Sequence, residues 1–117
     1  MADITDLEIG QGETFHITLQ LQQHSGSVVQ YLDITDYEFA GQVRENYSTD
    51  EIAAAFTFDT SLAPESGSVS VTLTPQQTLS LSQREYVYDI NMTTDDSPAV
   101  VRRILEGGLY VRPASTR

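Results

Sequence analysis

Cysteine, lysine and tryptophan are all absent from this chain of 117 residues. Without cysteine, the fold cannot depend on disulfides, and cysteine-based metal sites are excluded. No run approaches the roughly 18 apolar residues that a membrane-spanning helix needs. The first ten residues, MADITDLEIG, contain neither the basic nor the apolar region of a secretory signal. We therefore expect an intact soluble protein, made in a cytoplasm, that folds as a single domain over residues 1–117.

Positive charge is scarce and unevenly placed. Seventeen acidic residues stand against six arginines, which gives a formal net charge of -11. Most of such a surface repels nucleic-acid phosphates and anionic membranes, so we expect neither as a partner. A basic partner or a role in solubility fits the acidic body better. Four of the six arginines, however, fall within the last sixteen residues, RRILEGGLYVRPASTR.

The residues that usually carry catalysis or hold metals form no recognisable constellation. His16 lies on the polar face of a predicted strand and His24 in a turn, and neither has a partner nearby in sequence for a metal or proton-transfer site. There is no G-x-S-x-G motif and no glycine-rich phosphate loop before a helix. Acidic pairs at 33/36, 50/51 and 95/96 lack the spacing of a complete calcium loop, although calcium binding by one of these turns stays open. We expect no enzymatic activity, no cofactor and no metal site.

Alternation of apolar and polar residues runs through most of the chain and predicts β-strands. Turn residues separate the alternating segments at intervals of roughly 8 to 15 residues, which is typical of an antiparallel sandwich. The segment 52–58 is interpreted as a strand that leads through Phe56 and Phe58. The residues expected to face inward are Phe15, Ile17, Leu19, Leu21, Tyr37, Phe39, Val43, Val69, Val71, Leu73, Tyr86, Tyr88, Ile90 and Met92.

One short helix is predicted between two of these strands, in TPQQTLSLSQREY (74–86). Thr74 is placed to cap it, Pro75 occupies the first helical position, and Gln77 follows the cap by three residues, as in a capping box. We expect one or two turns that cross the end of the sandwich. In immunoglobulin-like domains such a crossing leads to a strand whose tyrosine hydroxyl fixes the corner, and Tyr86 is the candidate here.

The C-terminal segment combines arginines with a pair of glycines. Adjacent residues of a strand project to opposite faces, so Arg102 and Arg103 cannot both be buried without partners. Gly107-Gly108 is expected to interrupt the alternation as a β-bulge that redirects the following residues. An edge strand of this kind is either guarded against pairing or used for docking, and the alternative is that the arginines balance carboxylates of their own domain. The candidate protein interface comprises Arg102, Arg103, Tyr110, Arg112 and Arg117.

Six segments along the chain form an ordered set of motifs: QGETF (11–15), DITDYEF (33–39), GQVR (41–44), GSV...LTPQQT (67–78), YVYDI (86–90) and RILEG...VRP...TR (103–117). In order and spacing they resemble small structural proteins of tailed bacteriophage virions and, more loosely, the immunoglobulin-like N-terminal domain of phage baseplate upper proteins. The resemblance spans nearly the whole chain. The family usually carries Leu-Thr-Gly-Tyr where this chain has Ile34-Thr35-Asp36-Tyr37, which affects the turn but not the strand after it.

The resemblance implies a β-sandwich. Together with the patterns above, we expect an all-β, immunoglobulin-like antiparallel β-sandwich of seven to nine strands with one short connecting helix, followed by a free tail at about residues 113–117. It implies a non-catalytic virion protein of the tail, baseplate or neck, made in the bacterial host cytoplasm, that binds other virion proteins in symmetric multiple copies. Because baseplate upper proteins continue into a stalk, we expect a stand-alone adaptor rather than a receptor-binding protein. Capsid decoration of the phage head is the alternative, and a carbohydrate-binding or adhesion module using Tyr31, Tyr47 and Tyr110 is the rival from another class.

Overall fold

The computed structural model describes residues 3–25, 27–82, 85–94 and 97–113, and strands make up most of these ranges. None of the helices in them has the length and apolar character that crossing a membrane requires. The elements are β1 (Asp3–Ile4), β2 (Leu7–Gly10), β3 (Phe15–Gln20), β4 (Gln22–Ser25), β5 (Val28–Tyr31), β6 (Glu38–Arg44), β7 (Ala54–Ala55), β8 (Thr57–Asp59), a 3-10 turn (Pro64–Ser66), β9 (Ser68–Leu73), α1 (Pro75–Leu79), β10 (Glu85–Thr93) and β11 (Val101–Arg112).

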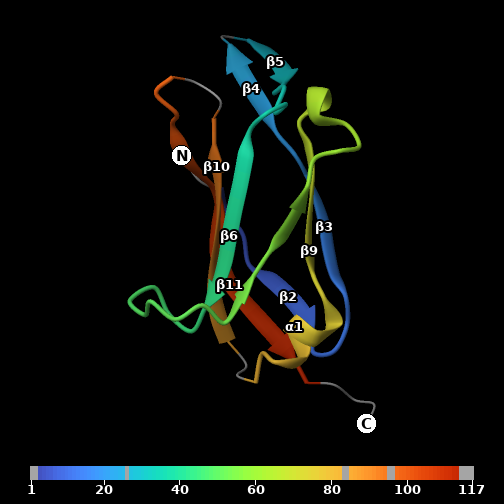
Figure 1. The fold of residues 1–117 in the computed structure, drawn as a ribbon, viewed down its shortest axis with the longest axis vertical. Coiled ribbons are helices and arrows are strands. Elements are labelled where there is room, and N and C mark those ends of the chain that lie inside the picture. Colours follow the sequence, from blue (N-terminus) through green and yellow to red (C-terminus); the bar gives the residue numbers. More distant parts are fainter. Residues whose placement is uncertain (1–2, 26, 83–84, 95–96, 114–117) are drawn as a thin grey trace.

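Two sheets pack face to face as a β-sandwich (Figure 1). The larger sheet has the order β1-β11-β10-β6-β7, with β2 also beside β11, and the smaller sheet has the order β3-β9-β8. The chain passes between the sheets from β7 to β8 and from β9 to β10, as the Greek-key connections of such sandwiches require. The prediction of an all-β sandwich with one short connecting α-helix is confirmed. The pattern did not predict the separate hairpin of β4 and β5, which projects from one end and includes His24 in β4 rather than in a turn.

The core lies where the inward rows of the two sheets meet. Val69, Val71 and Leu73 of the central strand β9 are fully buried, as their alternation predicted. Burying a side chain of this size contributes about 1.5–3 kcal/mol. Phe15 and Ile17, on the edge strand β3, pack against the same core but are only half-buried. The larger sheet contributes Ile9, Val43, Tyr86, Tyr88, Ile90, Leu105, Leu109 and Val111.

The segment predicted as one strand over 52–58 is instead two short strands in different sheets. β7 pairs with β6, whereas β8 pairs with β9. Between them Phe56 is buried, and its ring centroid lies 6.3 Å from that of Phe15 and 6.1 Å from that of Tyr88. The chain therefore changes sheets at an aromatic residue that fills the core during the crossing.

The helix α1 begins and ends close to the predicted residues. The Thr74 hydroxyl accepts the Gln77 N–H at 3.2 Å, and the Gln77 side chain accepts the Thr74 N–H at 2.9 Å, so the predicted capping box is confirmed. The buried Thr78 hydroxyl donates to the Glu13 carbonyl at 2.7 Å and accepts the Gly12 N–H at 3.0 Å. These bonds attach the helix to the turn between β2 and β3.

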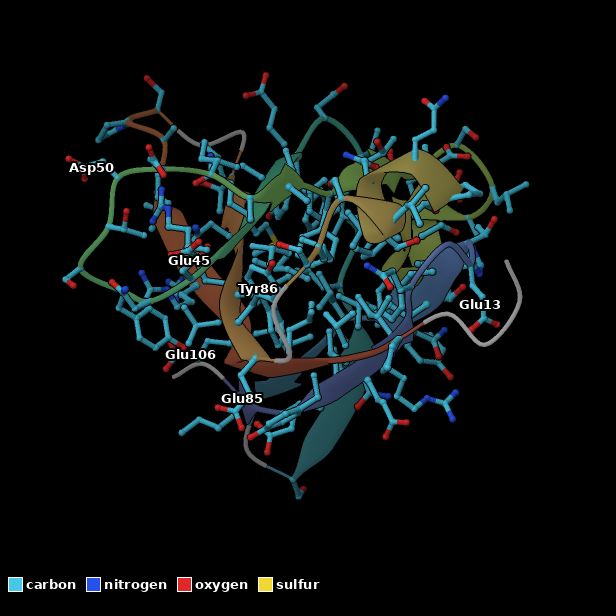
Figure 2. The ribbon with its side chains drawn as sticks, turned by 90° about the horizontal axis from the view of Figure 1, so that it is seen from below. Glu13, Glu45, Asp50, Glu85, Tyr86 and Glu106 are labelled. Atoms are coloured by element: carbon cyan, nitrogen blue, oxygen red, sulfur yellow. The ribbon has the colours of Figure 1, made fainter. Side chains whose placement is uncertain are left out.

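Two tyrosines of β10 point into the sandwich. Tyr86 is 5% exposed and lies between the sheets in the view of Figure 2. Its role as the corner tyrosine stays a prediction. Tyr88 is 1% exposed, and its hydroxyl donates to the Thr5 carbonyl at 2.5 Å. The Tyr88 hydrogen bond attaches β10 to the N-terminal segment. The alternation of apolar and polar residues does not predict this contact.

Contrary to the prediction, β11 is not an edge strand. β1 and β2 run parallel along the side of β11 that faces away from β10, and Thr5 and Asp6 separate the two short strands. The Thr5 N–H donates to the Glu106 carbonyl at 2.8 Å, and the Gly108 N–H donates to Asp6 Oδ1 at 3.0 Å. The N-terminal segment therefore supplies this edge of the larger sheet.

The β-bulge in β11 lies at Ile104 and not at Gly107-Gly108 as predicted. The register with β10 shifts between Arg103 and Leu105, which leaves Ile104 as the extra residue. Through both glycines the register is unbroken. Gly107 is needed for a different reason, because a Cβ there would lie 2.2 Å from the Thr5 carbonyl oxygen.

Asp36 adopts a left-handed backbone conformation, with φ of 68°, in the turn before β6. The Tyr37 N–H donates to the Ile34 carbonyl at 3.0 Å and closes this turn. A side chain with Cβ costs roughly 1–2 kcal/mol in this conformation, whereas glycine adopts it freely. We expect Asp36→Gly to be more stable than Asp36→Ala by about 1–2 kcal/mol in urea unfolding. Equal midpoints and slopes for the two variants would contradict a left-handed residue at this position.

Candidate protein interface

The described arginines of the predicted interface do not gather into one patch. Arg102 and Arg112 stand near opposite ends of β11, and ten residues of strand span roughly 33 Å. Arg102 and Arg103 project to opposite faces of the sheet, as adjacency predicted. Arg117 lies outside the described residues. The interface role of these residues stays a prediction, and each described arginine has a different environment.

Arg103 lies on the outer face of the larger sheet among carboxylates of its own domain. Its guanidinium is 2.9 Å from Glu106 Oε2 and 3.4 Å from Asp89 Oδ2. The hydrogen bond to Glu106 raises the pKa of Arg103 above its ordinary value. The Tyr47 hydroxyl is close by, and burial together with the charges of Glu106 and Asp89 raises the pKa of Tyr47. The charge of Arg103 is therefore balanced by carboxylates of its own domain, and its attraction for a carboxylate of a partner is weak.

Arg112 pairs with Glu8 of the neighbouring strand β2 at 2.8 Å. Both side chains are well exposed, at 70% and 61%, and an exposed pair of this kind contributes about 0–1 kcal/mol. Tyr110, two residues earlier on β11, is 43% exposed and lies opposite Glu8 and Glu85. Arg112 and Tyr110 are accessible, but the surface around them carries carboxylates.

Arg102 lies in a different environment. It lies opposite Met92 of β10, whose side chain belongs to the core, so Arg102 projects on the core side of the sheet. Here the sandwich ends, and the side chain remains exposed. Among the described residues no carboxylate forms an ion pair with it. Although the chain has a net charge of -11, none of the described carboxylates neutralises Arg102.

An open pocket of about 410 Å³ lies beside Arg102. Its lining residues Leu21, Gln22 and Leu32 lie at the base of the β4-β5 hairpin. This hairpin projects from one end of the sandwich (Figure 1). The apolar walls of the pocket cover the smaller of the two core clusters, which contains Ile34, Val69 and Met92. We call this feature the Arg102 pocket, and its lining residues are Leu21, Gln22, Leu32, Tyr37, Met92, Thr94, Arg102 and Ile104.

The base of the loop that leads into β11 is fixed beside this pocket. The Thr94 N–H donates to the Val100 carbonyl at 2.9 Å, and the Val100 N–H donates to the Thr94 hydroxyl at 3.0 Å. Thr94 is buried, whereas Val100 is exposed, so the two bonds lie at the boundary between the core and the surface. This pair of bonds sets the point at which β11 begins, and hence the position of Arg102 at the pocket.

Tyr31 is not brought together with the other two tyrosines proposed for carbohydrate binding. Tyr31 lies on β5 in the projecting hairpin, whereas Tyr110 lies near the end of β11 (Figure 1). The Tyr47 hydroxyl is 3.5 Å from the Gly107 carbonyl oxygen, on the larger sheet. A carbohydrate platform needs aromatic rings on one surface, and these three do not share one.

The acidic turns are organised by their own hydrogen bonds. Asp33 Oδ1 accepts the Thr35 hydroxyl at 2.6 Å and the Thr35 N–H at 3.0 Å, and the side-chain bond is the main reason that the pKa of Asp33 is lowered. Asp95 and Asp96 lie outside the described residues. Within the described ranges, no three His, Cys, Asp or Glu side chains are grouped to hold a metal ion.

The chain matches no protein-family model and no curated protein sequence. Among solved structures, it is similar to a nucleoside hydrolase-related hypothetical protein from Saccharophagus degradans that is associated with carbohydrate metabolism. The identity is 10% and the TM-score 0.41, over 93% of this chain and 22% of that one. It is also similar to AggA, the major subunit of aggregative adherence fimbriae type I from Escherichia coli, with 14% identity and a TM-score of 0.34, over 92% of this chain and 89% of that one. Similarities at these scores carry no argument about function.

Proposed function

We propose that this chain is a non-catalytic structural protein of a bacteriophage virion, in the tail, baseplate or neck, and that it binds another virion protein through the Arg102 pocket. The ordered segments that resemble small virion proteins support the class of function. The observation that supports the binding mode is the exposed guanidinium of Arg102 beside an apolar pocket, with no ion pair among the described residues.

This arrangement suits a partner that presents a carboxylate next to an apolar side chain. The apolar walls of the pocket gain free energy by leaving water, and the arginine fork pairs a carboxylate with two parallel hydrogen bonds. Arg103 and Arg112 are less suited to this role, because carboxylates of the same domain already pair with them. An acidic body repels an acidic partner at most approaches, so a contact centred on the exposed Arg102 favours this orientation.

The class of function is tested by locating the chain in particles. Virions purified from the bacterium that encodes the chain should contain it in multiple copies, as measured by quantitative mass spectrometry. Tails separated from heads should retain it, whereas retention by heads alone would replace the tail proposal by capsid decoration. A chain found only in the soluble lysate, or one that binds defined glycans on an array, would contradict the virion role.

The binding mode is tested by charge reversal. Arg102→Glu should lower incorporation into particles at least about tenfold, because it sets two carboxylates against each other at the contact. Arg112→Glu is the matched control, since Arg112 pairs with Glu8 of its own domain, and it should reduce incorporation far less. Higher salt should weaken wild-type binding in the same direction. If Arg102→Glu is incorporated at the wild-type level while the virion location holds, the pocket is not the contact.

A further inference from the structure

Charge is distributed unequally between the two outer faces of the sandwich. On the larger sheet, the outward positions of the paired strands are rich in charge: Glu8, Glu38, Arg44, Glu85, Asp89, Arg103, Glu106 and Arg112. In Figure 2 the labelled side chains of Glu45, Glu85 and Glu106 lie on this side of the molecule. The outward positions of the smaller sheet form what we call the neutral face: His16, Thr18, Gln20, Thr57, Asp59, Ser68, Ser70 and Thr72.

The neutral face continues a long stretch without charge. Residues 14–32 contain no Asp, Glu, Lys or Arg, although charged residues make up 20% of the chain. This stretch comprises β3 and the hairpin of β4 and β5. The only formal charge on the neutral face is Asp59, which lies on β8 at the opposite edge from β3. An acidic protein therefore has a region where another acidic molecule meets little electrostatic repulsion.

Along this region, β3 leaves one side of its backbone unpaired. β3 ends the order of the smaller sheet, and in the described residues no strand pairs with its outer side. The Leu21 N–H donates to the Gly67 carbonyl at 2.9 Å, and this position continues the register of β3 with β9. In an antiparallel pair, alternate residues bond to the partner strand. The peptide groups of His16, Thr18 and Gln20 therefore point away from β9, toward the open side.

This edge lacks the usual protection against pairing. Natural edge strands are commonly guarded by lysine, proline or a β-bulge, and β3 has none of these in FHITLQ. Its apolar row is also incompletely covered. Phe15, Ile17 and Leu19 are half-buried, whereas their partners on β9 are fully buried. A further strand beside β3 would complete both the hydrogen bonding and the coverage of this row.

We propose that a second copy of this chain pairs with β3 through its own β3, antiparallel and about a twofold axis, so that the two small sheets become one continuous sheet. The outward peptide groups set the register: Thr18 lies opposite Thr18 of the second copy, and His16 lies opposite Gln20. On the core side, Ile17 then lies beside Leu19 of the second copy. This contact is isologous, since each copy uses the same patch.

Charge and self-complementarity argue for a second copy as the occupant. Two chains of net charge -11 repel each other at most approaches, and the charge-free edge is where that repulsion is weakest. On the outer face this pairing sets Thr18 opposite Thr18 and His16 opposite Gln20, and on the inner face it sets Ile17 opposite Leu19. Pairs of polar residues and pairs of aliphatic residues are both favourable across strands. Antiparallel pairing also places the two copies of Glu13, which precede the strands, at opposite ends. Leu21 and Gln22 follow β3 directly and line the Arg102 pocket, but the two proposals are tested at different residues, Thr18 and Arg102, so either can fail alone.

The experiment compares two identical substitutions on the neutral face by analytical ultracentrifugation of the full chain. The wild type should form a dimer as its concentration rises to roughly 0.5 mM. Thr18→Lys places two like charges across the axis and should weaken the dimer at least about tenfold. Thr57→Lys, on β8 at the far edge of the same face, is the matched control and should leave the dimer intact. Raised salt should strengthen the dimer, because it screens the repulsion between the acidic bodies.

A thiol tests the register directly. The chain has no cysteine, so Thr18→Cys introduces its only thiol. Directly opposed residues in such a pair have Cα atoms about 5.5 Å apart, which a disulfide can bridge. Mild oxidation should link Thr18→Cys into disulfide-bonded dimers and leave Thr57→Cys monomeric. If Thr18→Lys does not fold, this crosslinking result alone tests whether β3 pairs with β3. A wild type that stays monomeric, a dimer indifferent to Thr18→Lys, or a dimer lost through Thr57→Lys would each overturn the proposal.

Discussion

Gly107→Ala should lower the free energy of unfolding by about 3 kcal/mol, near the upper end of what one added methyl group costs in a packed site. The new Cβ would lie 2.2 Å from the Thr5 carbonyl oxygen and 2.8 Å from its carbonyl carbon. The backbone at Thr5 has little freedom to retreat, because its N–H is bonded to the Glu106 carbonyl and its carbonyl accepts the Tyr88 hydroxyl. The substitution must therefore displace the N-terminal segment from β11.

The neighbouring glycine provides the control. The nearest atoms to a Cβ at Gly108 belong to side chains and lie farther away: the Tyr110 hydroxyl at 3.2 Å, and Asp6 Oδ1 and the Tyr110 ring carbon Cε2 at 3.3 Å. Gly108→Ala should thus cost less than about 1 kcal/mol. Urea unfolding monitored by circular dichroism measures both variants. Equal losses for the two, or a Gly107→Ala variant as stable as the wild type, would contradict the close approach of Thr5 to β11.

Local patterns in the sequence predicted those parts of the fold that depend on neighbouring residues. The alternation in β9 predicted the buried row of Val69, Val71 and Leu73, because a central strand has one face on the core and one facing out. The capping box at Thr74 and Gln77 was predictable for the same reason, since its atoms lie within one helical turn. Each of these features needs no information from distant segments.

Features that depend on pairing between distant segments were missed. The sequence does not show that the N-terminal segment lies beside β11, and so the last strand was interpreted as an edge. The bulge at Ile104 determines which face of the sheet each of the two adjacent arginines occupies. If the alternation continued without a bulge from the buried Leu105, Arg103 would face the core. The extra residue Ile104 reverses this, so that Arg103 lies on the outer face beside Asp89 and Arg102 faces the pocket.

The candidate site was therefore predicted in its residue type but not in its arrangement. The sequence directs attention to the arginines near the C-terminus, because four of the six arginines in the chain lie there. Which of them remains available depends on carboxylates contributed by β2 and β10, far apart in sequence. The pocket beside Arg102 combines residues from the β3-β4 junction, β10 and β11, and no single segment reveals it.

Tyr88→Phe should lower the free energy of unfolding by about 1–3 kcal/mol near pH 8, because the Thr5 carbonyl loses a sheltered hydrogen-bond donor. The cost should also depend on pH. Burial, with smaller effects from the charges of Asp6 and Glu106, raises the pKa of Tyr88 to about 12. In the unfolded chain the same hydroxyl titrates near pH 10. Tyr31→Phe, which removes a hydroxyl from the exposed hairpin, is the control and should leave stability near pH 8 unchanged within about 0.5 kcal/mol.

The sign of the pH effect follows from proton binding. Between about pH 10 and pH 12 the unfolded chain has released the Tyr88 proton while the folded chain retains it, so the unfolded state binds fewer protons and stability falls as pH rises. The stabilisation from the Tyr88 hydroxyl is thus fully present below about pH 10 and is lost toward pH 12. Tyr88→Phe has no proton to lose at this position, so urea unfolding of the wild type and the variant should converge across this range. A difference in stability that stays constant from about pH 9 to pH 12 would mean that the Tyr88 hydroxyl ionises equally well in the folded and unfolded chain.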